Sequence, residues 1–168
     1  QILVEYTIKH HFPNHSSEND DSLILWLTQI GQETARMICE WMRVGFVHGV
    51  MNTDNMSIHG LTIDYGPYGW IEDYNPDWTP NTTDARTGRY RFGHQAQIGA
   101  WNFARLLESI SPLMEDPERL YESLDAYYSE YEKLNNDMWS NKLGLGQFNE
   151  GDGELIKDEI VAETGPFL

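Results

Sequence analysis

The chain is poor in cysteine, in basic residues and in long apolar runs, and each shortage narrows the classes of protein that fit it. Cys39 is the only cysteine among 168 residues, so an internal disulfide is impossible. There are 11 basic residues against 27 acidic ones, which gives a formal net charge of -16. Such a surface repels nucleic-acid backbones and anionic membranes. No apolar run approaches the roughly 20 residues that cross a bilayer, and we expect neither nucleic acid nor a membrane as a partner.

Two further absences concern the N-terminus and zinc. No signal-type segment is visible at the N-terminus, because Lys9 and two histidines follow the first apolar residues and no cleavage-type stretch comes after them. The start at Gln1 rather than at methionine indicates a fragment. We expect a bacterial cytoplasmic location, or a mitochondrial one for a eukaryotic source. A single cysteine and the lack of an H-E-x-x-H pattern argue against zinc.

The chain does have enough apolar material for a folded domain and a strong helical periodicity. Apolar residues make up 40% of it, and we predict a single domain over residues 1–168. Cys39 falls among apolar neighbours and is expected to be a buried structural thiol. The patterns predict helices over residues 1–12, from Asp21 or Ser22 to a stop at Gly45, over 95–110, from Asp116-Pro117 to about Met138, and over 154–163.

A region without helical period separates the second and third of these helices. Two short extended pieces, 57–58 and 61–63, flank a turn at His59-Gly60 and predict a small β-hairpin. Residues 65–92 follow as a long loop that is rich in turn residues and aromatics. We expect these aromatics to pack against the helical core, with a substrate platform as the alternative. The expected fold class is mainly α (α+β), with the small hairpin carrying the functional loop.

That functional loop, called here the 47–67 loop, reads V-H-G-V-M-N-T-D-N-M-S-I-H-G-L-T-I-D-Y-G-P. Asp54 and Asn55 are adjacent in it, and Asp64 follows nine residues after Asn55. A hairpin between them would return Asn55 and Asp64 to the same end. Oxygen ligands that converge in this way suit Mg²⁺, which is held by one or two protein groups plus substrate phosphates. Taken without any family context, the three residues fit turn and cap positions equally well.

The spacing within the loop matches kinase-type active sites. There a His is followed two residues later by a catalytic Asp and seven residues later by a metal-binding Asn, with a D-F-G motif further on. His48 and Asn55 reproduce the seven-residue spacing, and D-Y-G at 64–66 takes the place of D-F-G. Val50 stands where the catalytic Asp belongs and cannot accept a proton, so the nearest candidate base is Asp54. We expect His48 to hold the loop through backbone carbonyls.

The run H-G-V-M-N-T-D-N-M-S-I, together with L-T-I-D-Y-G-P, closely resembles the selenoprotein O family, pseudokinases that act as protein adenylyltransferases. The resemblance covers most of the chain, through Y-N-P at 74–76, G-R-Y at 88–90, Gln95, W-N-F-A-R-L at 101–106 and K-L-G-L at 142–145. It implies the C-terminal lobe of a protein-kinase-like fold. The family's Gly-rich stretch and its Lys/Glu/Arg set belong to an N-terminal lobe that has no counterpart here. That missing lobe is the expected intramolecular partner.

The resemblance also implies roles for three residues. Asp54 matches the catalytic general base, Asn55 and Asp64 match the metal ligands, and Asp64 also binds the nucleotide. It implies ATP as the substrate, Mg²⁺ as the metal with Mn²⁺ as an alternative, and transfer of AMP to Ser, Thr or Tyr hydroxyls of proteins. Attack at the α-phosphorus requires neutralisation of charge on the pyrophosphate leaving group and a carboxylate near the incoming hydroxyl. The isolated chain is expected to be inactive.

Two other functions stay open from the sequence, a kinase-like transfer of the γ-phosphoryl group and a non-catalytic nucleotide-binding or scaffold module. Val50 argues against the first, and the presence of both metal positions argues against the second. Outside the loop, Arg89 and Arg105 are expected to form ion pairs, with phosphate contact as the alternative. Trp101 and the stripe that contains Tyr127 and Tyr131 are expected to lie in the core.

Overall fold

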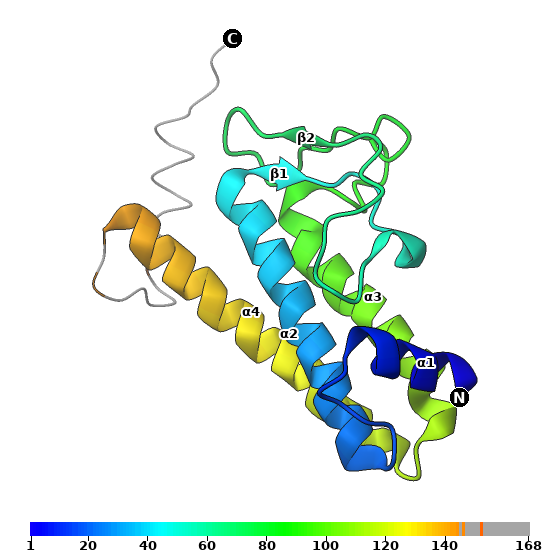
Figure 1. The fold of residues 1–168 in the computed structure, drawn as a ribbon. Coiled ribbons are helices and arrows are strands. Elements are labelled where there is room, and N and C mark those ends of the chain that lie inside the picture. The colour runs from blue at the N-terminus through cyan, green and yellow to red at the C-terminus, as the bar shows by residue number, and fades with distance from the viewer. Residues whose placement is uncertain (145, 147–151, 153–168) are drawn as a thin grey trace.

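The computed structural model describes residues 1–144, 146 and 152 and is built mainly from helices (Figure 1). The predicted helices are confirmed, apart from the one over 154–163, which lies outside the described residues. Among the described residues, no helix combines the length and hydropathy of a membrane span. The elements in chain order are α1 (Ile2–His11), α2 (Asp20–Val44), β1 (Phe46–Val47), η1 (Thr53–Asn55), β2 (Gly69–Trp70), η2 (Phe92–His94), α3 (Gln95–Ile110), η3 (Ser111–Leu113), η4 (Pro117–Arg119) and α4 (Leu120–Leu143).

Helix α2 forms the centre of the core. Its N-cap is Asn19, whose side chain accepts a hydrogen bond from the backbone N–H of Ser22, so the helix begins just before the predicted caps. It ends at Gly45, which adopts the left-handed conformation with φ of 71°, as glycine does at helix ends. Its apolar residues repeat every three or four positions, and the buried ones include Leu23, Leu27, Ile30, Ile38 and Trp41.

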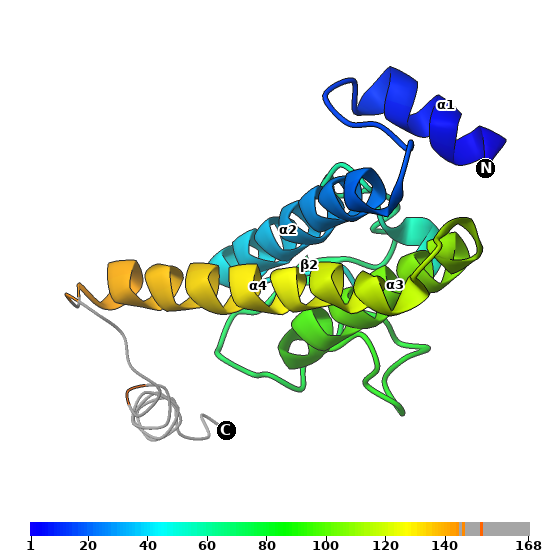
Figure 2. The same cartoon turned by 90° about the horizontal axis from the view of Figure 1, so that it is seen from below.

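Helices α3 and α4 both pack against α2 and also contact each other, and α1 lies beside the N-terminal end of α2 (Figures 1 and 2). The close approach of α3 to α2 depends on a residue without a side chain, because a Cβ on Gly31 of α2 would meet the ring of Phe103 of α3 at 2.8 Å. Tyr127 of α4 is almost fully buried and donates a hydrogen bond from its hydroxyl to the carbonyl of Ala96 over 2.7 Å. The prediction that Tyr127 lies in the core is confirmed, and Tyr131 packs against the same cluster half-buried.

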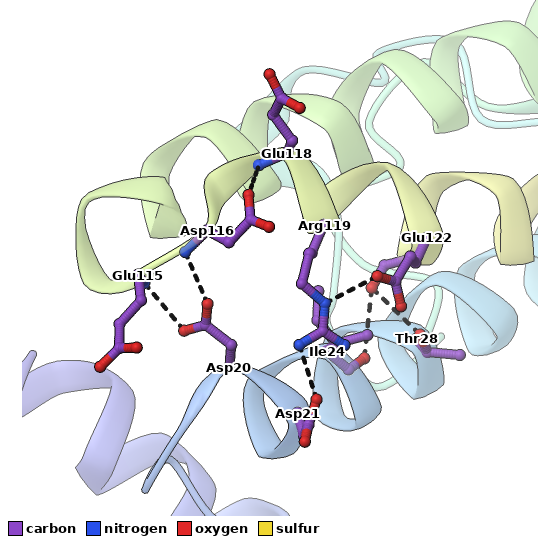
Figure 3. A network of polar contacts seen from close by, with 10 residues as sticks. Asp20, Asp21, Ile24, Thr28, Glu115, Asp116, Glu118, Arg119 and Glu122 are labelled. Carbon is purple, nitrogen blue, oxygen red and sulfur yellow. Dashed lines mark hydrogen bonds and ion pairs between the residues drawn. The ribbon is translucent and has the colours of Figure 1, made fainter.

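A polar network joins the beginning of α2 to the beginning of α4 (Figure 3). The carboxylate of Asp20 accepts hydrogen bonds from the backbone N–H groups of Asp116, at 2.8 Å, and Glu115, at 3.1 Å. These two bonds hold the pKa of Asp20 below its usual value. Arg119 donates to Asp21 at 2.7 Å and to Glu122 at 2.9 Å. The network fixes two helix starts that are far apart in the sequence.

The small sheet is not the predicted hairpin. β1 pairs antiparallel with β2, with Phe46 opposite Trp70 and Val47 opposite Gly69. The two strands therefore bracket the 47–67 loop at its base, beyond the end of α2 (Figure 1). The coarse fold class, mainly helical with a small antiparallel sheet, is confirmed.

The predicted strands at 57–58 and 61–63 are wrong because their polar groups bond elsewhere. Only the turn is present, with the N–H of Gly60 donating to the carbonyl of Ser57 at 3.2 Å. Thr62 accepts from the indole N–H of Trp41 at 2.9 Å. The carbonyl of Ile63 accepts from a histidine side chain. The segment lies close against α2, since a Cβ on Gly60 would meet the carbonyl oxygen of Glu33 at 2.7 Å.

Candidate active site

Asp54 and Asn55 lie in η1, a single 3₁₀ turn near the middle of the 47–67 loop. Asp54 is exposed and Asn55 is half-buried. The Asn55 side chain donates from Nδ2 to the carbonyl of Val50 over 3.0 Å. This bond orients the amide and leaves its Oδ1 available as an oxygen ligand. Val50, at the position of the usual kinase base, thus contributes through its backbone.

His48 is fully buried beneath this turn. Its Nε2 donates to the carbonyl of Ile63 over 2.7 Å, and its Nδ1 accepts from the N–H of Val50 at 3.3 Å. Both bonds are satisfied by a neutral imidazole with the proton on Nε2. Burial lowers the pKa of His48, against the opposing effects of the Ile63 carbonyl and of Asp64. The prediction that His48 holds the loop through a backbone carbonyl is confirmed.

These bonds connect the two candidate metal ligands. Asn55 bonds to Val50, Val50 bonds to His48, and His48 bonds to Ile63, the residue before Asp64. The predicted hairpin was to bring Asn55 and Asp64 together. Instead, a buried histidine ties the two ends of the loop to each other.

Asp64 itself has a strained backbone. Its φ of 51° makes it the only non-glycine residue with positive φ among the residues that the structure describes. Its side chain is exposed. Backbone strain of this kind costs about 1–3 kcal/mol and is found most often at functional sites. The strain marks Asp64 as a residue that the surrounding loop holds in place.

The 47–67 loop is also held by side chains that sequence reasoning did not assign to the site. Two come from α3. Gln95 donates to the carbonyl of Phe46 at 2.9 Å and accepts from the N–H of His48 at 3.0 Å, and Asn102 donates to the carbonyl of Met51 at 2.9 Å. Both are buried polar residues. The signal was present, because two amides seven residues apart on the apolar face of a helix need buried partners.

Two more supports come from the long loop after the D-Y-G motif. Asn81 is buried and donates to the carbonyl of Gly49 at 3.0 Å. Tyr90 donates from its hydroxyl to Oδ1 of Asn52 at 2.6 Å. Together with the α3 amides, they supply hydrogen-bond partners along the stretch from Phe46 to Asn52. No local sequence pattern indicates these two, because both lie in an aperiodic segment.

Gly49 is required where the two ends of the loop meet. Its φ is 81°, and a Cβ there would lie 2.4 Å from the carbonyl oxygen of Pro67. Only glycine permits both the left-handed conformation and this backbone approach. The residue that follows His48 therefore sets how closely the D-Y-G-P end lies against the start of the loop.

The aromatic residues after Asp64 pack only in part. Tyr65, Tyr68 and Trp70 contact the ring of buried Phe46, with ring centroids 5.5–6.3 Å apart. They remain 45%, 46% and 54% exposed. The expectation that they pack against the core is correct for one side of each ring, and the other side faces outward.

Two predictions beside the site need correction. Trp101 is 42% exposed and is not a core residue, because the buried face of α3 is formed by its neighbours Asn102 and Phe103. Arg105 forms the expected ion pair, with Glu108. Arg89 instead stacks on Trp101, with its guanidinium carbon 4.6 Å from the ring centroid.

The donor set fits a hard divalent cation shared with phosphates. In the described part of the chain, no three His, Cys, Asp or Glu side chains are grouped to hold a metal ion by themselves. Asn55 and Asp64 offer an amide oxygen and a carboxylate from two parts of one loop that are linked through His48. An ion bound there would complete its coordination with water and substrate oxygens, which is the usual arrangement for Mg²⁺.

The 47–67 loop of this helical domain presents an amide, two carboxylates and the D-Y-G turn, which are side-chain types that metal-assisted phosphate-transfer sites use. The family model described as "Protein adenylyltransferase SelO" matches residues 1–168. The chain belongs to this family. The family membership that the motifs predicted is confirmed.

Relatives carry a related printed name. The chain is 50% identical over 154 residues to "Protein nucleotidyltransferase YdiU" of Flavobacterium johnsoniae, covering 92% of this chain and 30% of that protein. It is 51% identical over 155 residues to the protein of the same name from Xanthomonas campestris pv. campestris, with the same two coverages. For the Rhodopirellula baltica protein the identity is 51% over 174 residues, covering 98% of this chain and 32% of the relative. The chain thus spans about a third of the length of these relatives.

Proposed function

We propose that this chain is the catalytic-loop part of a protein adenylyltransferase, which transfers AMP from ATP to Ser, Thr or Tyr hydroxyls of proteins. The observation that carries the proposal is the linkage of Asn55 to strained Asp64 through buried His48. It sets two metal-type oxygen ligands on a loop that also presents Asp54. The printed names of the family and of the relatives support the same reaction class.

Asp54 is proposed as the general base. It is exposed on η1 and has no hydrogen-bond or ion-pair partner among the described residues. Its carboxylate is therefore free to accept the proton of an incoming hydroxyl. In the transfer, the hydroxyl oxygen bonds to the α-phosphorus, the bond between that phosphorus and the bridging oxygen breaks, pyrophosphate leaves and the proton passes to Asp54.

Asn55 and Asp64 are proposed as the metal ligands, with Asp64 also close to the nucleotide. A bound Mg²⁺, or Mn²⁺ as an alternative, supplies neutralisation of the charge that develops on the pyrophosphate. The residues themselves orient the ligand oxygens. The Val50 carbonyl fixes the Asn55 amide, and the loop backbone holds Asp64 in its left-handed conformation.

The wider architecture belongs to the same proposal. We infer a kinase-like C-terminal lobe over a single domain, whose partner is an N-terminal lobe that grips the ATP phosphates. The share of the relatives' length that the chain spans supports this division. By itself the chain would be inactive. A bacterial cytoplasmic location, or a mitochondrial one for a eukaryotic source, is the proposed setting.

The test uses the full-length protein with Mg²⁺, a protein mixture as acceptor, and ATP labelled on either the α- or the γ-phosphate. Label transferred only from the α-position, and lost in Asp54→Asn and Asp64→Asn, supports the proposal. Asp54→Asn should retain nucleotide binding. Asp73→Asn removes the same charge from another exposed loop residue and should leave transfer unchanged.

Other results would favour the alternatives. Label transferred only from the γ-position would show a kinase reaction and contradict the inference from Val50. No transfer, with nucleotide binding retained, would indicate a non-catalytic nucleotide-binding or scaffold module. Full activity of Asp54→Asn would remove that residue from the role of base.

A further inference from the structure

Most arginines of this acidic chain are paired with carboxylates, and Arg86 and Arg89 are not. Among the described residues, no carboxylate lies within ion-pair distance of Arg86 or Arg89. Arg86 and Arg89 are both exposed. The arginines with ion pairs are Arg36, Arg43, Arg91, Arg105 and Arg119.

Arg89 is held against an exposed indole. Its guanidinium carbon lies 4.6 Å from the ring centroid of Trp101 and 5.6 Å from that of Tyr90. Arg105 lies over the same indole at 5.3 Å. We call Arg89, Trp101 and Arg105 the basic–aromatic patch. An arginine stacked on a ring keeps its N–H edge free for a planar, bidentate contact with a carboxylate.

The turn that carries Arg89 is held by hydrogen bonds to a buried carboxylate. The buried carboxylate of Asp84 accepts hydrogen bonds from the backbone N–H groups of Arg89, at 3.0 Å, and Tyr90, at 2.7 Å, and from the hydroxyl of Thr87. A guanidinium on an ordered turn loses less conformational entropy on binding than one on a mobile segment. The patch is therefore preorganised.

The patch adjoins the proposed catalytic turn. Tyr90, next to Arg89, bonds to Asn52, and Asn102, next to Trp101, bonds to the carbonyl of Met51. Both contacts fall within three residues of Asp54 in the sequence. Neighbours of Arg89 and Trp101 therefore hydrogen-bond to the segment that leads directly into Asp54.

We propose that the basic–aromatic patch binds an acidic side chain of the protein substrate, close in sequence to the hydroxyl that receives AMP. The inference rests on the proposed adenylyltransferase function and adds the substrate class. A formal charge of -16 makes most of this chain repel an acidic segment, so the unpaired guanidinium of Arg89 gives local complementarity. The exposed pair of Arg105 with Glu108 is weak enough to exchange for a substrate carboxylate.

The experiment measures peptide binding to the full-length protein by fluorescence anisotropy, which does not depend on AMP transfer. One labelled peptide has a serine flanked by glutamates, and the other has glutamines in their place. Wild-type protein should prefer the glutamate peptide, and Arg89→Ala should reduce that preference about fivefold, the effect of one partly exposed charge pair. Arg36→Ala is the matched control, because it removes the same charge from the pair with Glu33 and Glu130.

Charge reversal gives the sharper test. Arg89→Glu should lose the glutamate preference and gain affinity for a third peptide with lysines at the same positions. Equal binding of the glutamate and glutamine peptides by wild-type protein would overturn the proposal. So would a loss of ATP affinity in Arg89→Ala with the peptide preference unchanged, which would assign Arg89 to the nucleotide phosphates. Failure of AMP transfer alone would count against the proposed function and would leave the peptide result intact.

Discussion

The imidazole of His48 donates a hydrogen bond to the carbonyl of Ile63 over 2.7 Å, and this contact places Asp64 relative to the beginning of its own loop. The histidine is fully buried and accepts a second bond from the N–H of Val50. The loop whose sequence has the kinase-type spacing is thus held together by a buried, neutral histidine. Asp54, an exposed carboxylate of the same loop, is the group that we propose for proton transfer.

His48 should make stability depend on pH. Burial lowers its pKa below 6.5 in the folded state, so the unfolded chain binds the proton more readily. The stabilisation is fully present above pH 6.5 and is lost as the pH falls from that value towards the lower, folded-state pKa. Urea unfolding of wild-type and His48→Gln chains across this range measures it. The wild type should lose stability on acidification more steeply than the variant, and parallel curves would show that folding does not lower the pKa of His48.

Gly49→Ala should be strongly destabilising. The new methyl group would enter the van der Waals radius of the Pro67 carbonyl oxygen, on a backbone with φ of 81°. We expect a loss of about 2–5 kcal/mol in the free energy of unfolding. Gly66→Ala is the control, because no atom lies within 4 Å of a Cβ there. A similar loss for both variants would mean that the close approach does not determine the cost.

Asn102→Ala should destabilise the chain by about 1–3 kcal/mol, because the buried carbonyl of Met51 loses its donor. Asn102→Asp should cost more, since it removes the same donor and adds a buried charge. In the wild-type chain the Oδ1 atom of Asn102 already lacks a hydrogen-bond partner among the described residues. Thermal unfolding of both variants, with exposed Gln97→Ala of the same helix as reference, gives the comparison. An ordering with Asp better tolerated than Ala would contradict the assigned hydrogen bond.

Asp64 should separate stability from function. Glycine adopts positive φ freely, so Asp64→Gly should change the free energy of unfolding by less than about 1 kcal/mol while removing the carboxylate that we propose as a metal ligand. A β-branched residue resists this conformation, and Asp64→Val should cost about 1–3 kcal/mol. Chemical denaturation of the two variants tests this. Equal stability would show that position 64 is not held in the left-handed conformation.

Cys39 should report unfolding. It is buried in α2, and burial raises the pKa of its thiol to about 11. Because the thiolate is the reactive form, the folded chain should react very slowly with a thiol reagent at pH 8. Reaction should become fast when denaturant opens the core. Rapid labelling of the folded chain would show that α2 opens locally around this residue.

The helices were predictable because their signals are local. The periodicity of α2, its stop at Gly45 and the span 95–110 all follow from residues within a few positions of one another. The three candidate site residues were also identified from spacing, and their chemical roles stay predictions. The burial of Cys39 was predicted from its apolar neighbours.

The strand pairing was not predictable in the same way. β1 and β2 are two residues each, and they pair across more than twenty intervening positions. Residues 57–63 have extended patterns, but their polar groups bond to Trp41 and His48. These bonds form only because α2 packs against the segment, and a local sequence pattern holds no information about that packing.

The sequence by itself determined the helical core, the family and the identity of the loop that carries Asp54, Asn55 and Asp64, because periodicity, helix caps and motif spacing are written along the chain. The tertiary structure alone decided how the loop is held, through His48, Gln95 and Asn102. It also decided that Trp101 lies on the surface under Arg89. These features depend on hydrogen bonds and stacking between residues distant in sequence, whose energies are set only when the helices have packed.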